Sequence, residues 1–523
     1  MKGLGTAAAS AAVILLGGVG GAAAADLGTM PTKALPVASP AMCSSIMDFF
    51  TTACQVAAYG VRFYGTIDVG ATYESHGSPM DKFLGVNSFV GKMSNGPKFL
   101  LAPNGLSASN VGFQIKEPLG AGWSFVGQVE TGFNPYSMYA LNGVHSVFNA
   151  IGTPLSQQTA FGDSNSQGAF YNDLGFTGVS HDTWGTLTFF RQNDLMQDAV
   201  LAYDPMGVGA AFSPLGFFGG FAGGGDTQNR RDTTAIKYRV NLANWHLGAY
   251  GQVGGYNQGN AANGGAQGDI GADFNVGPGV LSFDTIGAWK KDAVSLGSGL
   301  VGAVDQFGNP VFTNAGGLLL NGKPINFESV TISNNTSVMA TAKYEVDKLR
   351  LYAGYEYIHF GAPSDPQSAF TDIAGDFICA GCNTPAGLVF NGTTISNSAL
   401  NGKVQQMLWV GGKYALTSSL DVTAAYYHDW QNDFSGGVGN TPTNPVTGIQ
   451  GAKGSGDTCA QSSIANASCA GHRDSVSAVL DWRFAPKWDT YLGVGYSHIA
   501  GGYASGYLQN EVLQTTGGIR FRW

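Results

Sequence analysis

Residues 513–523 read LQTTGGIRFRW, and their alternation decides the class of fold. With a period of two, Leu513, Ile519 and Trp523 fall on one face of an extended strand, while Arg520 and Arg522 fall on the other. One face suits lipid and the other suits water. A strand of this kind has two neighbours and no free edge in a closed barrel. We therefore interpret it as the closing strand of a transmembrane β-barrel.

The same alternation recurs about fifteen times upstream. This gives sixteen predicted strands, an even number as in bacterial outer-membrane barrels. They cover residues 59–73, 106–117, 122–133, 169–180, 183–191, 232–241, 244–254, 266–276, 279–290, 335–346, 348–360, 403–414, 418–430, 473–484, 487–498 and 513–523.

The connections between these strands alternate in length. The short connections are residues 118–121, 181–182, 242–243, 277–278, 347, 415–417 and 485–486. The long connections include residues 75–105, 134–168, 192–231, 291–334, 361–402 and 431–472. Outer-membrane barrels have short periplasmic turns and longer extracellular loops, so this segregation indicates the same arrangement. The predicted fold is all-β: a 16-stranded antiparallel transmembrane barrel with long extracellular loops.

The composition agrees with a membrane barrel and disagrees with a soluble domain. Only 12% of the residues are charged, against about 25% in ordinary soluble domains, while 12% are aromatic. After the N-terminus no apolar run approaches the roughly twenty residues that a spanning helix needs. Dispersed apolar side chains suit lipid-facing strands, and tryptophans near the strand ends are expected to form aromatic girdles.

The N-terminus predicts export. Residues 1–25 form a predicted cleaved signal peptide, with Lys2, an apolar stretch over residues 7–16, and small residues before Asp26; an uncleaved anchor helix is the alternative. Residues 26–58 read as an irregular leader and residues 59–523 as the barrel. Removing Lys2 from 26 basic residues leaves 25 against 35 acidic ones, a formal charge of −10. This balance argues against nucleic acid as a partner.

The six cysteines fall in three close pairs, Cys43/Cys54, Cys379/Cys382 and Cys459/Cys469. In an exported chain, such pairs are most simply local disulfides within loops. The CxxC spacing of Cys379 and Cys382 also occurs in redox enzymes and zinc sites, but neither a helix pattern nor a histidine-rich segment follows it. We therefore predict no cofactor and no metal at these cysteines; a calcium site built from an acidic loop, such as residues 365–376, is the alternative for the rest of the chain.

Short stretches of the chain resemble the general trimeric porins of Gram-negative outer membranes, especially those of alphaproteobacteria. The resemblance is carried by YGVRFYGTIDVG at residues 59–70, by GTLTFFRQND at residues 185–194 and by the terminal Trp523. It implies a third loop folded into the barrel, a homotrimer, and contact with outer-membrane lipid and lipopolysaccharide. A cysteine pair before the first strand, as at Cys43 and Cys54, also occurs in that branch. The chain lacks the PEFG-type motif of enterobacterial third loops.

An infolded third loop would bring charged residues to a pore constriction. The acidic members are on the loop, and the basic ones are on or next to predicted lumen faces: Asp194, Asp198 and Asp204 against Arg62, Lys116, Arg230, Arg231, Lys237 and Arg239. By resemblance, Arg231 lies where the family places a constriction arginine. Acids on a loop facing bases on the wall would create a transverse field that orients dipolar solutes. The alternative is that each charge is simply solvated.

The predicted function is therefore an outer-membrane porin for passive diffusion of small hydrophilic solutes and ions, with a mild preference for cations. No GxSxG, HExxH or P-loop pattern occurs in a supporting context, so we do not expect an enzyme. One alternative is a sugar-specific channel, which needs an aromatic track such as Tyr136, Tyr139, Phe217 and Phe218 could form. Another is a plugged structural or adhesive barrel.

Three histidines, His359, His428 and His498, lie near the outer ends of predicted strands. A histidine site at the extracellular rim would be one interpretation of this placement. We interpret them instead as scattered, solvated side chains.

Overall fold

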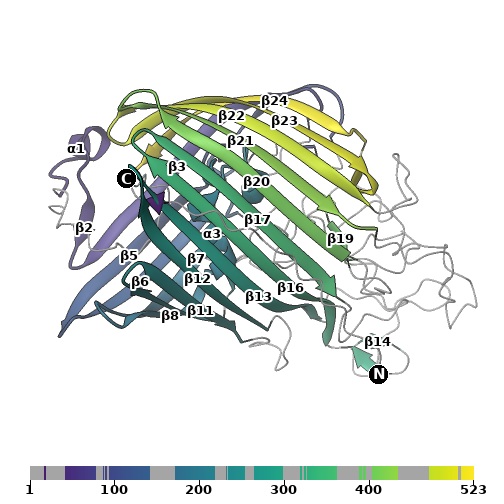
Figure 1. The fold of residues 1–523 in the computed structure, drawn as a ribbon, viewed down its shortest axis with the longest axis horizontal. Coiled ribbons are helices and arrows are strands. Elements are labelled where there is room, and N and C mark those ends of the chain that lie inside the picture. The colour runs from purple at the N-terminus through teal and green to yellow at the C-terminus, as the bar shows by residue number, and fades with distance from the viewer. Residues whose placement is uncertain are drawn as a thin grey trace, which may run out of the picture.

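A computed structural model of the chain shows a closed antiparallel barrel of sixteen strands (Figure 1). The structure describes residues 17–18, 42–77, 86, 89–90, 94–141, 171–217, 231–232, 234–253, 264–297, 318–320, 323–325, 327–361, 388–390, 393–395, 403–433, 470–504 and 508–523. The wall strands are β3 (Val61–Glu74), β5 (Ser109–Gly120), β6 (Trp123–Phe133), β7 (Leu174–His181), β8 (Gly185–Asn193), β10 (Ala235–Leu242), β11 (Trp245–Gln252), β12 (Gly265–Val276), β13 (Gly279–Gly297), β16 (Phe327–Val346), β17 (Leu349–Gly361), β20 (Lys403–Ala415), β21 (Leu420–Gln431), β22 (Gly471–Ala485), β23 (Trp488–Gly501) and β24 (Glu511–Arg522). The prediction of sixteen strands is confirmed.

The last strand closes the barrel, as its sequence predicts. β24 pairs on one side with β23 and on the other with β3, where Arg520 lies opposite Asp68 and Ile519 opposite Val69. Every wall strand therefore has two antiparallel neighbours. Closure leaves no row of unpaired backbone groups facing lipid, which is the condition for a sheet to span a bilayer.

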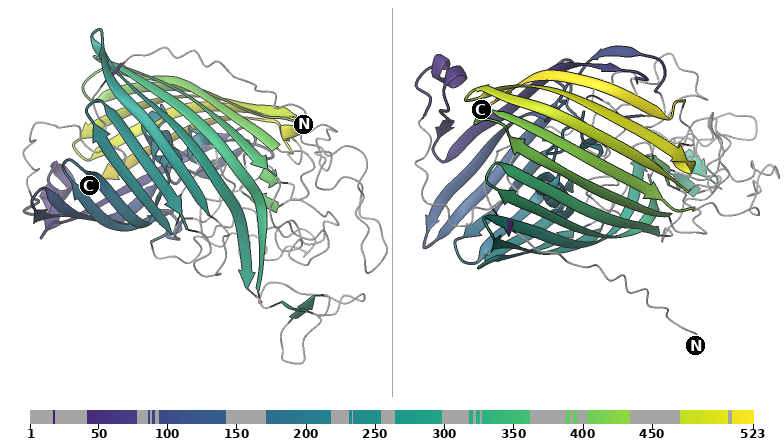
Figure 2. Two further views of the ribbon diagram at one scale, coloured as in Figure 1. Left: turned by 60° about the horizontal axis from the view of Figure 1, so that its bottom comes forward. Right: turned by 45° about the horizontal axis from the view of Figure 1, so that its top comes forward.

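Connection length differs between the two ends of the barrel (Figure 2). At one end, neighbouring strands join through tight turns such as residues 243–244 and 277–278. Positive φ angles at Ala243 (56°), Gly277 (57°) and Asp347 (48°) reverse the chain there. Because outer-membrane barrels keep short turns on the periplasmic side, we assign this end to the periplasm and the opposite end to the cell exterior.

Side chains on the wall alternate between a polar interior and an apolar exterior. On β23, Leu492 is 58% exposed to the outside, whereas its neighbour Tyr491 is 3% exposed and faces inward. On β24, Gln514, Thr516 and Arg520 are buried on the inner side. Most of the expected girdle tryptophans are exposed, namely Trp123, Trp184, Trp245, Trp289 and Trp482. The alternation read from the sequence therefore has the predicted orientation.

Shorter elements lie outside the sixteen-strand wall. They are β1 (Gly17–Gly18), β2 (Val56–Ala58), β4 (Lys98–Leu101), β9 (Arg231–Asp232), β14 (Leu318–Leu320), β15 (Lys323–Ile325), β18 (Leu388–Phe390), β19 (Thr393–Ile395), the helices α1 (Ile46–Thr51), α3 (Leu195–Tyr203) and α4 (Pro214–Phe217), and the 3₁₀ turn η2 (Gly502–Ala504). Within the described ranges, no helix has the length and apolar character needed to cross a membrane.

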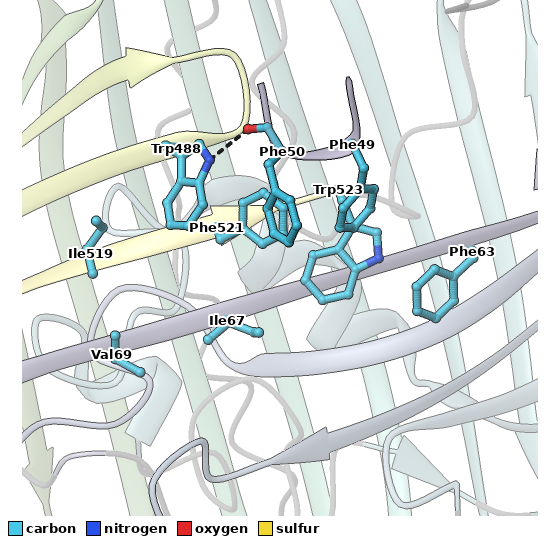
Figure 3. A pocket seen from close by; sticks show the side chains of 9 residues that line it. All are labelled: Phe49, Phe50, Phe63, Ile67, Val69, Trp488, Ile519, Phe521 and Trp523. Atoms are coloured by element: carbon cyan, nitrogen blue, oxygen red, sulfur yellow. Dashed lines mark hydrogen bonds between the residues drawn. The ribbon is translucent and has the colours of Figure 1, made fainter. Parts of the chain in front are cut away.

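Residues 42–58, the described part of the predicted leader, pack on the outside of the barrel at its periplasmic end. Ser45 begins α1, where its side chain accepts a hydrogen bond from the Asp48 backbone, and Cys43 and Cys54 form a disulfide across the helix. The rings of Phe49 and Phe50 lie 5.6 and 5.4 Å from that of Phe521. Figure 3 shows this aromatic group, which includes Trp488 and Trp523 and lies between α1 and the two strands that close the barrel.

Candidate functional site

The segment that follows β8 turns inward instead of continuing outward as a loop. Asp194 is the N-cap of α3, because its side chain accepts a hydrogen bond of 2.7 Å from the Gln197 backbone. The acidic Asp198 lies in the first turn, where the helix dipole favours negative charge. The helix ends at Asp204, whose backbone donates to Val200. The sequence thus encodes a short helix immediately after the strand.

This helix and the residues after it are held on the inner wall by an apolar cluster. The loop contributes Leu195, Met196, Val200, Phe212 and Leu215, all fully buried. The wall contributes Ile286, Met339, Ile358, Met407, Trp409 and Tyr427 from β13 to β21. Full burial of one large apolar side chain contributes about 1.5–3 kcal/mol. The cluster therefore attaches the segment to the wall through apolar side chains that are buried on both sides of the contact.

Trp409 is the largest wall residue in this cluster, and its packing depends on a neighbouring glycine, which has no side chain to occupy the same space. Its indole Nε1 donates a hydrogen bond of 3.1 Å to the carbonyl of Tyr203, at the end of α3. The ring lies against Gly354 on β17, where a Cβ atom would stand 2.0 Å from the ring. On β23, a Cβ at Gly493 would stand 2.5 Å from the ring of Phe212. These two glycines leave space on the inner wall for the loop and its tryptophan contact.

Ion pairs hold the helix at its first turn. Asp198 lies 2.8 Å from the Lys237 ammonium and 3.0 Å from the Arg239 guanidinium, both on β10. Arg239 also lies 3.3 Å from Asp269 on β12. Burial alone would raise the pKa of Asp198, but the charges of Lys237 and Arg239 outweigh it and hold the pKa below its ordinary value. The loop acid and the wall bases are thus in direct contact.

A second charged contact fixes the start of the helix. The Asp194 carboxylate accepts hydrogen bonds from the Lys290 ammonium at 2.9 Å and from the Gln267 amide at 2.8 Å. Both Asp194 and Lys290 are almost completely buried. Sequence reasoning missed Lys290 and Gln267, although both occupy inward positions in strands whose alternation was recognised.

The segment continues across the lumen to the other side of the barrel. Asp204 accepts a hydrogen bond of 2.6 Å from the Tyr427 hydroxyl on β21. The Ser477 hydroxyl on β22 donates to the Phe212 carbonyl at 2.6 Å, and the Gln514 amide on β24 donates to the Ala211 carbonyl. Burial raises the pKa of Asp204, and the hydrogen bonds that it accepts oppose this shift only in part. Residues 194–215 therefore reach from β8 to the closing strand.

The other predicted constriction residues lie elsewhere or outside the described residues. Arg62 lies opposite Gln114 in the β3–β5 pair and shares the inward face of β3 with Asp68. Lys116 lies near the periplasmic end of β5 and is exposed. The backbone of Arg231 forms β9 opposite Asn193 of β8, and Arg230 lies outside the described residues. Among the described members of the predicted set, ion pairs join Asp198 to Lys237 and Arg239.

A further set of paired charges lines the wall near the closing strand. Arg520 contacts Asp489 at 3.0 Å and Asp481 at 3.4 Å, and Arg522 contacts Asp489 at 2.7 Å. Nearby, Asp421 binds Arg483 at 2.6 Å and Lys413 at 3.1 Å. Alternation in the sequence places Arg520 and Arg522 on the inward face, but it does not identify their partners. The two-residue alternation predicts that these charged side chains face the lumen. Which of them meet is decided by the register between neighbouring strands.

Two groups among the described residues have the side chains and spacing to hold a metal ion. The inner group is His246, Asp269 and Asp284, where the His246 ring lies 3.2 Å from Asp284 and Asp269 is bound by Arg239. The ion pair between Arg239 and Asp269 already compensates part of the negative charge of this inner group. The outer group is His472, Asp474 and His498, near the extracellular rim.

Of the predicted disulfides, Cys43–Cys54 is present. Cys379, Cys382, Cys459 and Cys469 lie outside the described residues. The formed disulfide joins the segments on either side of α1, on the outside of the barrel.

Comparison with known proteins agrees with this architecture. The sequence model of the Gram-negative porin family matches residues 8–502. The chain is similar to the anion-selective porin from Comamonas acidovorans, with 12% identity, a TM-score of 0.50, and coverage of 88% of this chain and 99% of that chain. It is also similar to OmpT, an outer membrane protein of Vibrio cholerae, at 12% identity, with a TM-score of 0.47 and coverage of 90% and 99%. No curated protein matches the sequence. At such identities, the structural likeness shows the fold alone.

Proposed function

Because the chain belongs to the Gram-negative porin family and is an outer-membrane channel for passive diffusion of small solutes, we propose that its path narrows at residues 194–215 and mildly favours cations. Proteins of this family and fold are typically channels without enzymatic activity.

One observation carries the proposal, namely the attachment of residues 194–215 along their whole length. Ion pairs hold the first turn of α3 to β10, the apolar cluster holds its middle, and hydrogen bonds hold its end to β21, β22 and β24. A segment with so many buried contacts occupies part of the lumen permanently. It acts as a fixed constriction and not as a gate.

The charges support a weak preference for cations. Lys237 and Arg239 are both engaged by Asp198, and Arg239 also by Asp269, so these bases present little free positive charge to a passing ion. The chain as a whole has 35 acidic and 26 basic residues. An acidic surplus around a water-filled path raises the local concentration of cations. A constriction with paired charges keeps this preference mild.

Export and assembly complete the proposal. Cleavage of residues 1–25 would release the barrel with its leader, as the signal pattern predicts. Association into a homotrimer, and contact of the exposed wall with lipid and lipopolysaccharide, follow from the resemblance to trimeric porins. The exposed apolar side chains on the outer face, such as Leu480 and Leu492, support contact with lipid.

Single-channel recording in planar bilayers tests the function, with reversal potential measured under a salt gradient. We expect conductance steps in groups of three and a reversal potential shifted modestly toward the cation. A silent protein would support a plugged structural barrel instead. A reversal potential on the anion side would contradict the proposed charge preference but not the channel.

A sugar-specific channel gains no support from the aromatic residues proposed for its track. The Tyr136 hydroxyl donates to the Gly70 carbonyl at 2.7 Å, so that ring is held against the wall. Tyr139 is 41% exposed, the side chain of Phe217 is not described, and Phe218 lies outside the described residues.

A further inference from the structure

Three strands gather histidines on the outer surface of the barrel, at its extracellular end. His428 on β21 and His498 on β23 both lie directly opposite Asp474 of β22, and His472 precedes Asp474 by two residues on the same strand. Residues two apart point to the same side of a strand, and directly opposed residues have neighbouring side chains. Register therefore places three of the eight histidines of the chain around one carboxylate.

The cluster lies where the apolar outer band ends. Further along the same outward face of β22, Val476 and Leu480 are 51% and 45% exposed, while Arg473 and Ser475 face inward and are buried. The side chains of His428, His472 and Asp474 are about one-third to two-fifths exposed, at 31%, 42% and 34%. The group is thus accessible from the external medium. It belongs neither to the lumen nor to the attached loop.

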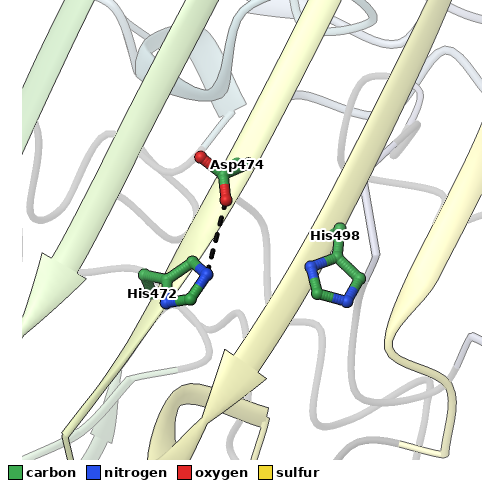
Figure 4. Close-up of side chains that lie close together, drawn as sticks. All are labelled: His472, Asp474 and His498. Carbon is green, nitrogen blue, oxygen red and sulfur yellow. Dashed lines mark ion pairs between the residues drawn. The ribbon is translucent and has the colours of Figure 1, made fainter.

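The Asp474 carboxylate is held by different partners at its two oxygens. Oδ1 accepts a hydrogen bond of 2.6 Å from the Tyr426 hydroxyl and lies 2.8 Å from Nδ1 of His428. Oδ2 lies 3.4 Å from Nε2 of His472. Figure 4 shows His498 on the neighbouring strand, beside the His472–Asp474 pair. Outer partners at one carboxylate oxygen are a usual way to orient the other oxygen toward a metal.

We propose that His472, Asp474 and His498 form a binding site for a first-row transition-metal dication of the zinc class, with His428 orienting the carboxylate. One donor atom from each of the three residues lies within 4.8 Å of the others. Donor atoms around tetrahedral zinc stand about 3.4 Å apart, so the His472–Asp474 pair is already spaced for it. Rotation of partly exposed side chains brings His498 into position.

The donor set also selects the metal. Two imidazoles and one carboxylate suit zinc or copper, whereas calcium and magnesium prefer oxygen ligands alone. Three protein ligands at an accessible surface leave a coordination position for water or an external ligand. The site therefore captures a metal from the cell exterior, independently of solute passage through the lumen.

Calorimetric titration of the untagged, chelator-treated protein in detergent with zinc chloride tests the site. We expect one zinc per chain, with no competition from a tenfold excess of calcium. The double variant H472N/H498N should abolish this binding, and H428N should weaken it by about 10–100-fold as an outer-shell change. H181N is the matched control, because His181 lies at the periplasmic end of β7 and should leave zinc affinity unchanged.

Copper provides a second readout that needs only the wild-type protein. The electron paramagnetic resonance spectrum of bound Cu²⁺ should show hyperfine coupling to imidazole nitrogens. Either of two zinc results would overturn the proposal: no zinc binding in the wild type, or a zinc affinity in H472N/H498N equal to that of the wild type. Equal competition by calcium, or a copper spectrum without nitrogen coupling, would also overturn it. Far-ultraviolet circular dichroism verifies that each variant retains the barrel.

Discussion

Among the described residues, α3 packs on the inside of the barrel wall and α1 on the outside, and these two short helices are buried very differently. The inner attachment consists of residues 194–215 on the lumen wall, where Leu195 and Met196 are 0% exposed. The outer attachment consists of α1 on Trp488, Phe521 and Trp523, where Ile46 and Met47 are 78% and 67% exposed. The same wall therefore carries one helix as a core element and the other as a surface cover.

The difference follows from the two solvents that the wall meets. An apolar patch facing a water-filled lumen is unfavourable unless protein covers it, so the inner patch needs the loop. An apolar patch facing lipid needs no such cover, so the outer helix shields only the periplasmic edge. We therefore expect disruption of the inner attachment to change conduction strongly, and disruption of the outer attachment to change it little.

The largest effect is expected for Trp409→Ala. Removal of this buried indole destabilises the packing between the loop and the wall by about 3–5 kcal/mol. It also deletes the hydrogen bond from the indole to the Tyr203 carbonyl. Because the barrel strands keep their pairing, the loss falls on the attached loop. Single-channel conductance should rise and become noisier. Trp482→Ala, at an outward position that is 50% exposed, is the control and should conduct as the wild type. Unchanged conductance in Trp409→Ala would show that the segment does not narrow the path.

Asp198→Asn should have the next largest effect. The change leaves the Lys237 and Arg239 charges only partly compensated, at a cost of about 3 kcal/mol, and moves the reversal potential toward anions. Asp48→Asn on the exposed helix α1 removes the same charge outside the barrel and should leave the reversal potential unchanged. A shift of equal size in both variants would show that net charge, and not the inner attachment, sets selectivity.

The same pair predicts how conduction depends on pH. The pKa of Asp198 in the folded protein lies below its ordinary value of 3.8, so its ion pairs contribute stability above pH 3.8 and lose it as the pH falls through the lowered pKa. The pKa of Asp204 is raised, so its contribution to stability has the opposite pH dependence. That contribution increases as the pH falls, and the attached loop is therefore favoured in acid. Conductance should therefore stay constant from pH 7 to pH 5. A rise already between pH 6 and pH 5 would contradict this assignment.

Gly354→Ala should produce a smaller change of the same kind as Trp409→Ala. The new methyl would stand 2.0 Å from the Trp409 ring, so the indole must shift, at a cost of about 1–3 kcal/mol. We expect a modest increase in conductance noise. Gly287→Ala on β13 is the matched control, because its Cβ would meet nothing within 4 Å. Noise at the wild-type level in both variants would show that the indole adapts without loosening the loop.

The smallest effect on conduction is expected for Cys43→Ser with Cys54→Ser. Loss of this disulfide increases the conformational entropy of the unfolded segment and lowers its free energy of unfolding by about 3 kcal/mol. Hydrogen exchange in α1 should therefore become faster. Conductance should not change, since α1 packs on the outside. A conductance change in this variant would remove the distinction between the two attachments.

The barrel was predictable from the sequence because its signals are local. Alternation in residues 513–523 places Arg520 inside and Ile519 outside whatever the rest of the chain does, and the tight turns mark the strand ends. The partners of those inward residues were not predictable. Asp198 and Lys237 were both recognised as charged candidates, but the direct contact between them depends on the path of the loop.

The sequence by itself therefore determined the number of strands, their faces, and the closure of the last strand on the first, since a two-residue period is a property of the extended backbone. Tertiary structure alone decided that Trp409 holds the loop, that Lys290 binds Asp194, and that His428, His472 and His498 surround one aspartate. Apart from His472 and Asp474, which are two positions apart on one strand, these contacts join residues dozens to hundreds of positions apart. They are set by strand register and barrel closure, which no short stretch of sequence encodes.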